Sequence, residues 1–239
     1  MGAGGRKIIA VVGSGGKTTY IKHAAKKYLS QGKKVFVTTT THMFIEKNSL
    51  LTDDADEIIR ELQEKKYAMA GISCGEKIKA LSDETYKKAC EYADIVLVEA
   101  DGSKQMPVKF PDYHEPVIPE NADEIVVVCT LQALGQSLVE AAHRPELVKA
   151  CLNAEDQTVL EAHHVQKLVR TGYTESLKKK YPDKRILIHC NHDTSLYQRT
   201  AAKLIESDMD VTVIDKNWFR TQPELISWVL KAYLCVSIS

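Results

Sequence analysis

Seven short apolar segments of strand length constrain the fold of this chain more than any other feature. Most are continuous rather than alternating, as "IIAVV" and "DIVLVE" illustrate. Strands that are buried on both faces have this pattern, as in a parallel sheet with helices on each side. We therefore expect strands over residues 8–12, 34–38, 67–72, 94–99, 124–129, 185–190 and 210–215.

Helical patterns separate these segments. From Ile21 to Leu29 the apolar residues recur at helical spacing, and Gly32 ends that helix. Further helices are expected over 53–66, 82–93 and 222–234. Alternating strands and helices predict a doubly wound α/β fold with a mostly parallel sheet. We expect one domain over 1–239, with a helical subdomain that contains no strand at about 136–180.

The charge balance and the apolar content restrict the surroundings of the chain. The 32 Lys and Arg residues equal the 32 Asp and Glu residues, which argues against a general attraction to nucleic acid or to a membrane. No apolar run reaches about 18 residues, and "MGAGGRK" lacks the apolar core of a signal peptide. The six cysteines form no CxxC pair. We expect a cytoplasmic protein without a nucleic-acid or membrane partner.

A glycine-rich turn connects the first expected strand to the first expected helix. It contains Gly13, Ser14, Gly15 and Gly16. Glycines let the backbone turn sharply and point successive N–H groups at one anion, and the helix N-terminus adds its dipole. The sequence therefore predicts a phosphate-binding loop.

The residues that follow the turn support this prediction. We expect Lys17, in the exposed first turn of the helix, to reach the β- and γ-phosphates, Thr18 to bind magnesium, and Thr19 to complete the nucleotide site. The standard loop has the pattern G-x-x-x-x-G-K-[ST], which would place a glycine where Val11 stands. The observed G-x-x-G-K-T-T resembles the shortened loop of Mur-type ligases. The expected fold is thus a sheet of the P-loop NTPase type with a helical insertion.

Polar residues also follow the second strand, in "VFVTTTTHMF". Ligands bind at the carboxyl ends of strands in open α/β sheets, and threonine hydroxyls can hold a metal, water or phosphate. Thr40 and His42 are therefore candidate substrate-binding residues, although each would also suit a purely structural role.

The segment 94–120 carries the third group of candidates. An apolar strand delivers Glu99 and Asp101 at its carboxyl end, where P-loop proteins place a magnesium-binding carboxylate. Lys104 and Lys109 follow in a loop stiffened by prolines, which suits an anionic substrate. We expect a magnesium site formed by Thr18, Glu99 and Asp101, and a single cleft lined by Lys17, Thr18, Thr40, His42, Asp101, Lys104 and Lys109.

Together these motifs resemble the YqeC-like family, described as selenium-dependent hydroxylase accessory proteins or selenium cofactor biosynthesis proteins. The pattern runs from G-x-G-G-K-T-T through T-T-T-T-H-M to V-E-A-D-G-S-K-x-x-P-x-K, and continues in "HRPE" at 143–146. The resemblance implies a P-loop NTPase-like protein that acts in the maturation of molybdenum hydroxylases that need labile selenium. It implies as partners the hydroxylase apoprotein, a molybdopterin cofactor or a selenium species.

Three functions remain open on this basis. The first is a magnesium-dependent nucleotide hydrolase that drives selenium or pterin cofactor handling. The second is an ATP-dependent ligase or kinase that activates a small anionic substrate, in line with the Mur-like loop. The third is a nucleotide-gated chaperone that docks on the hydroxylase with negligible turnover. The segment "CNHDTS" replaces the N-K-x-D of guanine-binding proteins, which favours ATP over GTP.

Overall fold

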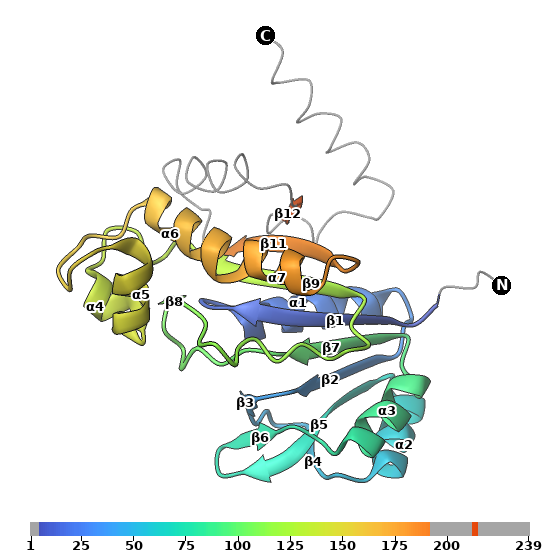
Figure 1. Ribbon diagram of the computed structural model, residues 1–239. Coiled ribbons are helices and arrows are strands. Elements are labelled where there is room, and N and C mark those ends of the chain that lie inside the picture. The colour runs from blue at the N-terminus through green and yellow to red at the C-terminus, as the bar shows by residue number, and fades with distance from the viewer. Residues whose placement is uncertain (1–4, 192–211, 215–239) are drawn as a thin grey trace.

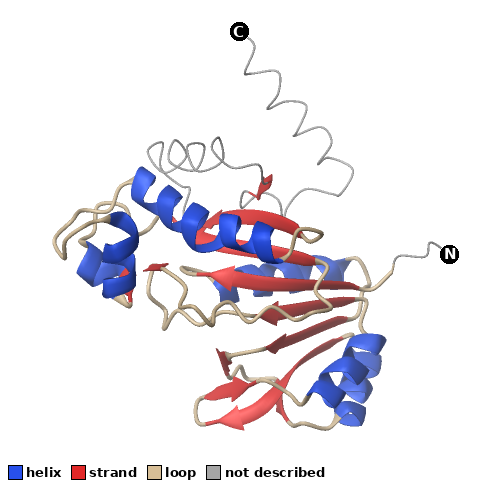
Figure 2. Ribbon diagram, viewed as in Figure 1, coloured by secondary structure: helices blue, strands red, loops and turns tan. Residues whose placement is uncertain are grey.

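The computed structural model describes residues 5–191 and 212–214 of the chain. It shows a mixed α/β fold around a mostly parallel sheet (Figures 1 and 2). The strand order is β12-β11-β9-β1-β7-β2-β5-β6-β3, and β4 pairs with β5. All seven expected strands are confirmed, as β1 (Lys7–Gly13), β2 (Val35–Thr39), β5 (Tyr67–Cys74), β7 (Ile95–Glu99), β9 (Glu124–Thr130), β11 (Arg185–Asn191) and β12 (Thr212–Ile214).

The order of the strands places β1 where the chain changes direction across the sheet. After β1 the chain moves to β2 and β5 on one side, returns to β7 next to β1, and then continues to β9 and β11 on the other side. β1 pairs in parallel with both β7 and β9. Ligands of open α/β sheets bind at the carboxyl ends of strands next to such a reversal. The end of β1 is therefore the favoured position for a site.

Helices cover both faces of the sheet, as expected for a doubly wound arrangement. One face packs against α1 (Lys17–Ser30) through buried residues such as Tyr20 and Ile21. The other face packs against α2 (Ala55–Lys65), α3 (Asp83–Tyr92), α6 (Ala162–Val169) and α7 (Glu175–Lys180). The expected helix over 222–234 lies outside the described residues.

Several short strands were not expected from the sequence. They are β3 (His42–Phe44), β4 (Ser49–Leu51), β6 (Lys77–Lys79), β8 (Val108–Lys109) and β10 (Ala142–His143). The expectation that 136–180 contains no strand is wrong, because β10 pairs with β8 in a separate two-stranded ribbon. Two or three residues are too few to show a periodic pattern, so only tertiary pairing reveals them.

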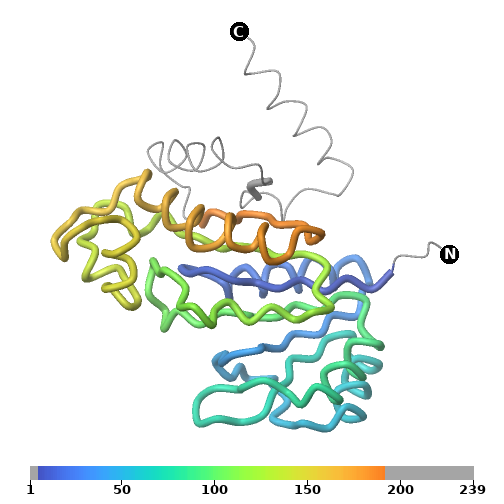
Figure 3. The backbone as a smooth tube through the Cα atoms, viewed as in Figure 1, coloured from blue at the N-terminus to red at the C-terminus, as the bar shows by residue number. Residues whose placement is uncertain are grey.

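The helical segment has a small core of its own. α4 (Leu138–Ala141) and α5 (Pro145–Leu152) enclose buried residues that include Leu138 and Val148, and Val108 of β8 joins them. In Figure 3 the green loop after β7 accordingly lies beside this segment. A π-helical turn, η1 (Arg170–Thr174), connects α6 to α7. In the part of the chain that the structure describes, no helix is both long and apolar enough to cross a membrane.

Gly172 in the π-helical turn gives a test of this packing. A Cβ at this position would lie 2.9 Å from Cδ of Pro111 and 3.2 Å from the ring of Phe110. Gly172→Ala should therefore lower the free energy of unfolding by about 1–3 kcal/mol, measured by urea denaturation. Thr171→Ala is the matched control, because Thr171 is exposed in the same turn. Equal stability of both variants would contradict the described packing.

Candidate functional site

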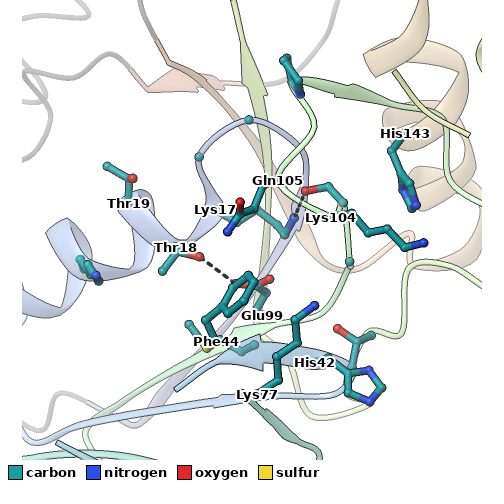
Figure 4. A pocket seen from close by; sticks show the side chains of 18 of the residues that line it. Lys17, Thr18, Thr19, His42, Phe44, Lys77, Glu99, Lys104, Gln105 and His143 are labelled. Carbon is teal, nitrogen blue, oxygen red and sulfur yellow. Dashed lines mark hydrogen bonds between the residues drawn. The ribbon is translucent and has the colours of Figure 1, made fainter. Parts of the chain in front are cut away.

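A cavity of about 750 Å³ opens at the carboxyl end of β1 (Figure 4). This volume lies within the range of small-molecule sites. Its walls come from the glycine-rich turn and α1, from 41–46 and Lys77, from the loop after β7, and from His143 and Arg144. Of the expected cleft residues it includes Lys17, Thr18, His42 and Lys104.

The glycine-rich turn has a backbone that requires glycine. Gly13 has a φ of 93°, and a Cβ there would lie 2.0 Å from the carbonyl oxygen of Val128. Gly16 has a φ of 129°, and its Cβ would lie 2.0 Å from Nδ2 of Asn191. The same Asn191 amide donates to the carbonyl of Gly15 at 3.0 Å. Strands β9 and β11 thus hold the turn against the N-terminus of α1.

Lys17 lies across this turn. Its Nζ donates to the carbonyl oxygen of Gly13 at 2.9 Å and to Oγ of Ser103 at 3.2 Å. The expectation that Lys17 is exposed is wrong, since only 5% of the residue is accessible. Burial lowers the pKa of Lys17, while Glu99 and Asp101 act in the opposite direction. The sheet edge and the loop after β7 close over the first helical turn, which the sequence could not show.

Thr18 and Glu99 meet at the floor of the cavity. The Thr18 hydroxyl donates to Oε2 of Glu99 at 3.3 Å, as the dashed line in Figure 4 marks. Burial raises the pKa of Glu99, whereas Lys17 and the Thr18 hydrogen bond lower it. A hydroxyl and a carboxylate are oxygen ligands of the kind that magnesium prefers. No cluster of three or more His, Cys, Asp or Glu that could hold a metal is found within 5–191.

Asp101 occupies a different place from the one expected. Its carboxylate is fully buried and does not line the cavity. Oδ2 accepts from the backbone N–H of Gly13 at 3.1 Å and from the Tyr173 hydroxyl at 2.7 Å, and Oδ1 pairs with Lys109. Burial raises the pKa of Tyr173 well above its usual value, so the phenol stays protonated and donates. These contacts engage both carboxylate oxygens and give no support to a magnesium-binding role.

Lys109 is likewise buried beneath the cavity rather than in its wall. Its Nζ pairs with Asp101 and lies 2.7 Å from Oε2 of Glu115, which accepts from Nη1 of Arg144 at 2.8 Å. A charged chain therefore extends from the glycine-rich turn to the cavity wall. The β8–β10 ribbon aligns it, because Lys109 and His143 are register partners and Arg144 follows.

The other candidates divide between lining and support. His42, Thr19 and Lys104 line the cavity. Thr40 instead donates to the carbonyl of Val117 at 2.7 Å, and Ser14 donates to the carbonyl of Pro107 at 2.9 Å. Thr40 is therefore not part of the wall, contrary to the expectation of one cleft. Both hydroxyls anchor the long loop that follows β7.

Sequence reasoning did not assign roles to several residues of the site. Ser103 and Glu115 lie in the long third motif, and Arg144 lies in "HRPE", so their motifs pointed to them without indicating a role. Tyr173 gave no signal, since it belongs to a helical stretch far from the turn in sequence. Asn191, the first residue of the segment that stands in place of N-K-x-D, contacts the turn through its amide; residues 192–195 of that segment lie outside the described residues.

Glu115 makes the charged chain testable by pH. Burial favours a higher pKa, but hydrogen bonds from Lys109 and Arg144 outweigh it and hold the pKa of Glu115 at about 2, against an ordinary 4.5. The ionised carboxylate therefore stabilises the fold above about pH 4.5, and this contribution is lost as the pH falls toward about 2.

Glu115→Gln should lower the free energy of unfolding by about 1–2 kcal/mol at pH 7, because it removes the charge that strengthens the hydrogen bonds from Lys109 and Arg144. The loss stays in this range because solvent at the cavity screens these charges. Between about pH 4.5 and 2, the free energy of unfolding of the variant should also fall less than that of the wild type, measured by denaturant unfolding. The exposed Glu120→Gln is the control. A pH profile for Glu115→Gln that parallels the wild-type profile would contradict the network.

Comparison with known proteins places this architecture in a family. Residues 9–146, more than half of the chain, match the family model described as YqeC protein. The YqeC protein of Escherichia coli (strain K12), whose activity is uncharacterized, is 32% identical over 153 residues, which cover 57% of this chain and 57% of that protein. The aligned part thus spans less than two thirds of that relative. The match includes the glycine-rich turn, Glu99, Asp101 and Arg144, and the chain belongs to the YqeC family.

Proposed function

We propose that this chain is a magnesium-dependent nucleotide-binding protein of the P-loop type that hydrolyses its nucleotide. The observation that carries the proposal is the joint position of Lys17, Thr18 and Glu99 in one cavity, at the N-terminus of α1 and the end of β1. Helix N-termini and glycine turns bind anions through free N–H groups. In this proposal the nucleotide phosphates would bind at this end of the cavity.

Each of these residues has a definite task in this proposal. Lys17 exchanges its contacts with Gly13 and Ser103 for phosphate oxygens, and it is already aligned over the turn. Thr18 and Glu99 would hold magnesium, which neutralises phosphate charge when it is bound. Asp101 acts indirectly, because it fixes the N–H of Gly13 at the start of the turn. The proposed nucleotide is ATP rather than GTP, because "CNHDTS" at 190–195 replaces the N-K-x-D of guanine-binding proteins.

The cellular role proposed for this activity is the maturation of selenium-dependent molybdenum hydroxylases. Its support is the resemblance of the three motifs to accessory proteins of that kind, together with membership of the YqeC family. The proposed cargo is a selenium species or a molybdopterin cofactor, and the proposed partner is the hydroxylase apoprotein. A role as a nucleotide-gated chaperone predicts binding of that apoprotein with negligible phosphate release.

A second candidate function is phosphoryl transfer to a small acceptor, as in a kinase or an ATP-dependent ligase. The shape of the cavity favours it, because the wall continues beyond Glu99 to Lys104, His143 and Arg144. A hydrolase needs space only for water at that end. Phosphate release and ADP formation, compared with and without small acids, separate the two reactions.

Lys17→Ala tests the nucleotide site. The variant should bind ATP and GTP at least about tenfold more weakly in calorimetric titration, because it loses the charge that faces the phosphates. Since Lys17 is buried, thermal unfolding must first show a folded variant. Lys27→Ala on the same helix, outside the cavity wall, is the control. Wild-type affinity in folded Lys17→Ala would refute the proposal.

Glu99→Gln and Asp101→Asn test which carboxylate serves the metal. Glu99→Gln should abolish most of the magnesium-dependent phosphate release at small cost in stability. Asp101→Asn should instead lower the melting temperature, because Lys109 would lose its buried partner. Phosphate release at several magnesium concentrations and thermal unfolding give both readouts. If Asp101→Asn instead lost phosphate release while Glu99→Gln kept it, Asp101 would be the carboxylate that serves the metal.

A further inference from the structure

Three residues in the cavity wall have a backbone conformation that their side chains disfavour. Five non-glycine residues with positive φ occur in the described part of the chain. Lys66 and Asn153 end helices, where this conformation is common. Lys104, Gln105 and Arg144, with φ of 47°, 65° and 57°, all line the cavity. Such backbone strain concentrates at functional sites.

Lys104 and Gln105 form the centre of a tight turn. The N–H of Met106 donates to the carbonyl of Ser103 at 2.9 Å, and both central residues have positive φ. Glycine, Asn and Asp dominate turns of this geometry. A Lys-Gln pair is therefore unfavourable for folding here. The turn presents both side chains to the cavity, next to the Ser103 hydroxyl that holds Lys17.

The positive charges of the cavity wall differ in their partners. Lys22 of α1 pairs with Glu46 at 2.8 Å, Arg144 pairs with Glu115 at 2.8 Å, and Lys77 lies 4.7 Å from the centroid of the Phe44 ring. Lys104 has no hydrogen bond or ion pair with any residue of the described ranges. Its side chain extends from the turn toward His143 (Figure 4).

His143 adds a polar atom that lacks a partner. Its Nδ1 is buried and makes no hydrogen bond within 5–191. Burial lowers the pKa of His143, and Arg144 and the two nearby lysines lower it further. Glu115 acts in the opposite direction, but the nearby positive charges outnumber it, so an anion beside the imidazole would be favourable.

We propose that Lys104, Gln105, His143 and Arg144 form a second anion-binding subsite, which holds the anionic group of an acceptor molecule opposite the glycine-rich turn. The acceptor carries a carboxylate or a tetrahedral oxyanion. This inference rests on the proposed nucleotide function, since the acceptor would face the terminal phosphate across Glu99. The strained turn is retained because it places the Lys104 ammonium group in the wall of the cavity.

The experiment uses the full chain saturated with magnesium and a non-hydrolysable imido analogue of ATP, so that the phosphate end is filled. Sulfate and malonate are then titrated separately at constant ionic strength, with binding measured by calorimetry. Lys104→Asn removes the charge and suits the backbone of the turn, whereas Lys104→Arg keeps the charge. Lys66→Asn is the matched control, an exposed lysine with a φ of 58° outside the cavity wall.

The expected result has two parts. Lys104→Asn should weaken binding of at least one probe about tenfold or more, while Lys104→Arg and Lys66→Asn stay close to wild type. Lys104→Asn should also melt at the same or a higher temperature, because Asn adopts positive φ more readily than Lys. Tighter binding of sulfate indicates a phosphorylated or other oxyanion acceptor, and tighter binding of malonate a carboxylate acceptor.

The inference is overturned if neither probe saturates in the wild type, or if Lys104→Asn binds both probes as the wild type does. Binding of the analogue is recorded first, so a failure of the nucleotide proposal is seen separately. In that case the probes are titrated into the free chain, and Lys17→Ala identifies any anion bound on the glycine-rich turn. An effect of Lys104→Asn that persists in Lys17→Ala supports the second subsite, and its absence overturns it.

Discussion

The architecture of the site depends on the interactions of the buried Asp101 carboxylate. It accepts the N–H of Gly13 and the hydroxyl of Tyr173, and it neutralises Lys109. These partners come from the end of β1, from the π-helical turn and from β8. Removing the carboxylate would leave the buried Lys109 ammonium with Glu115 as its remaining counter-ion, which is more costly than the loss of a surface pair. One side chain therefore connects the glycine-rich turn to the helical segment.

The charged chain that begins at Asp101 ends at the cavity. Lys109 pairs with Glu115, and Glu115 pairs with the guanidinium of Arg144 at the cavity wall. The short β8–β10 ribbon keeps the two segments in register. The helical segment is thus more than a cover for one end of the sheet, because it contributes side chains to the same cavity as the glycine-rich turn. A change at Asp101 can therefore affect the position of Arg144 through the ion pairs of Lys109 and Glu115.

The two ends of the cavity differ in how their backbone is accommodated. At the glycine-rich turn, glycine adopts the positive φ values without steric strain. At Lys104 and Gln105 the same kind of backbone is formed by residues that resist it. A turn selected for stability alone would carry Asn or Gly. The difference supports a functional role for the side chains of the second turn, in the proposed acceptor subsite.

The sequence by itself determined the seven main strands, the first three helices and the glycine-rich turn with Lys17 and Thr18, because each depends on local pattern: apolar runs, helical spacing and backbone freedom. It also delivered Glu99 to the carboxyl end of a strand, where it meets Thr18. Only the tertiary structure decided which polar groups face the cavity and which lie beneath it. Both Glu99 and Asp101 are buried, yet only Glu99 lines the cavity, because Tyr173 and Lys109 reach Asp101 from segments distant in sequence. No local pattern encodes such partners, since burial and ion pairing arise only when the separate segments pack together.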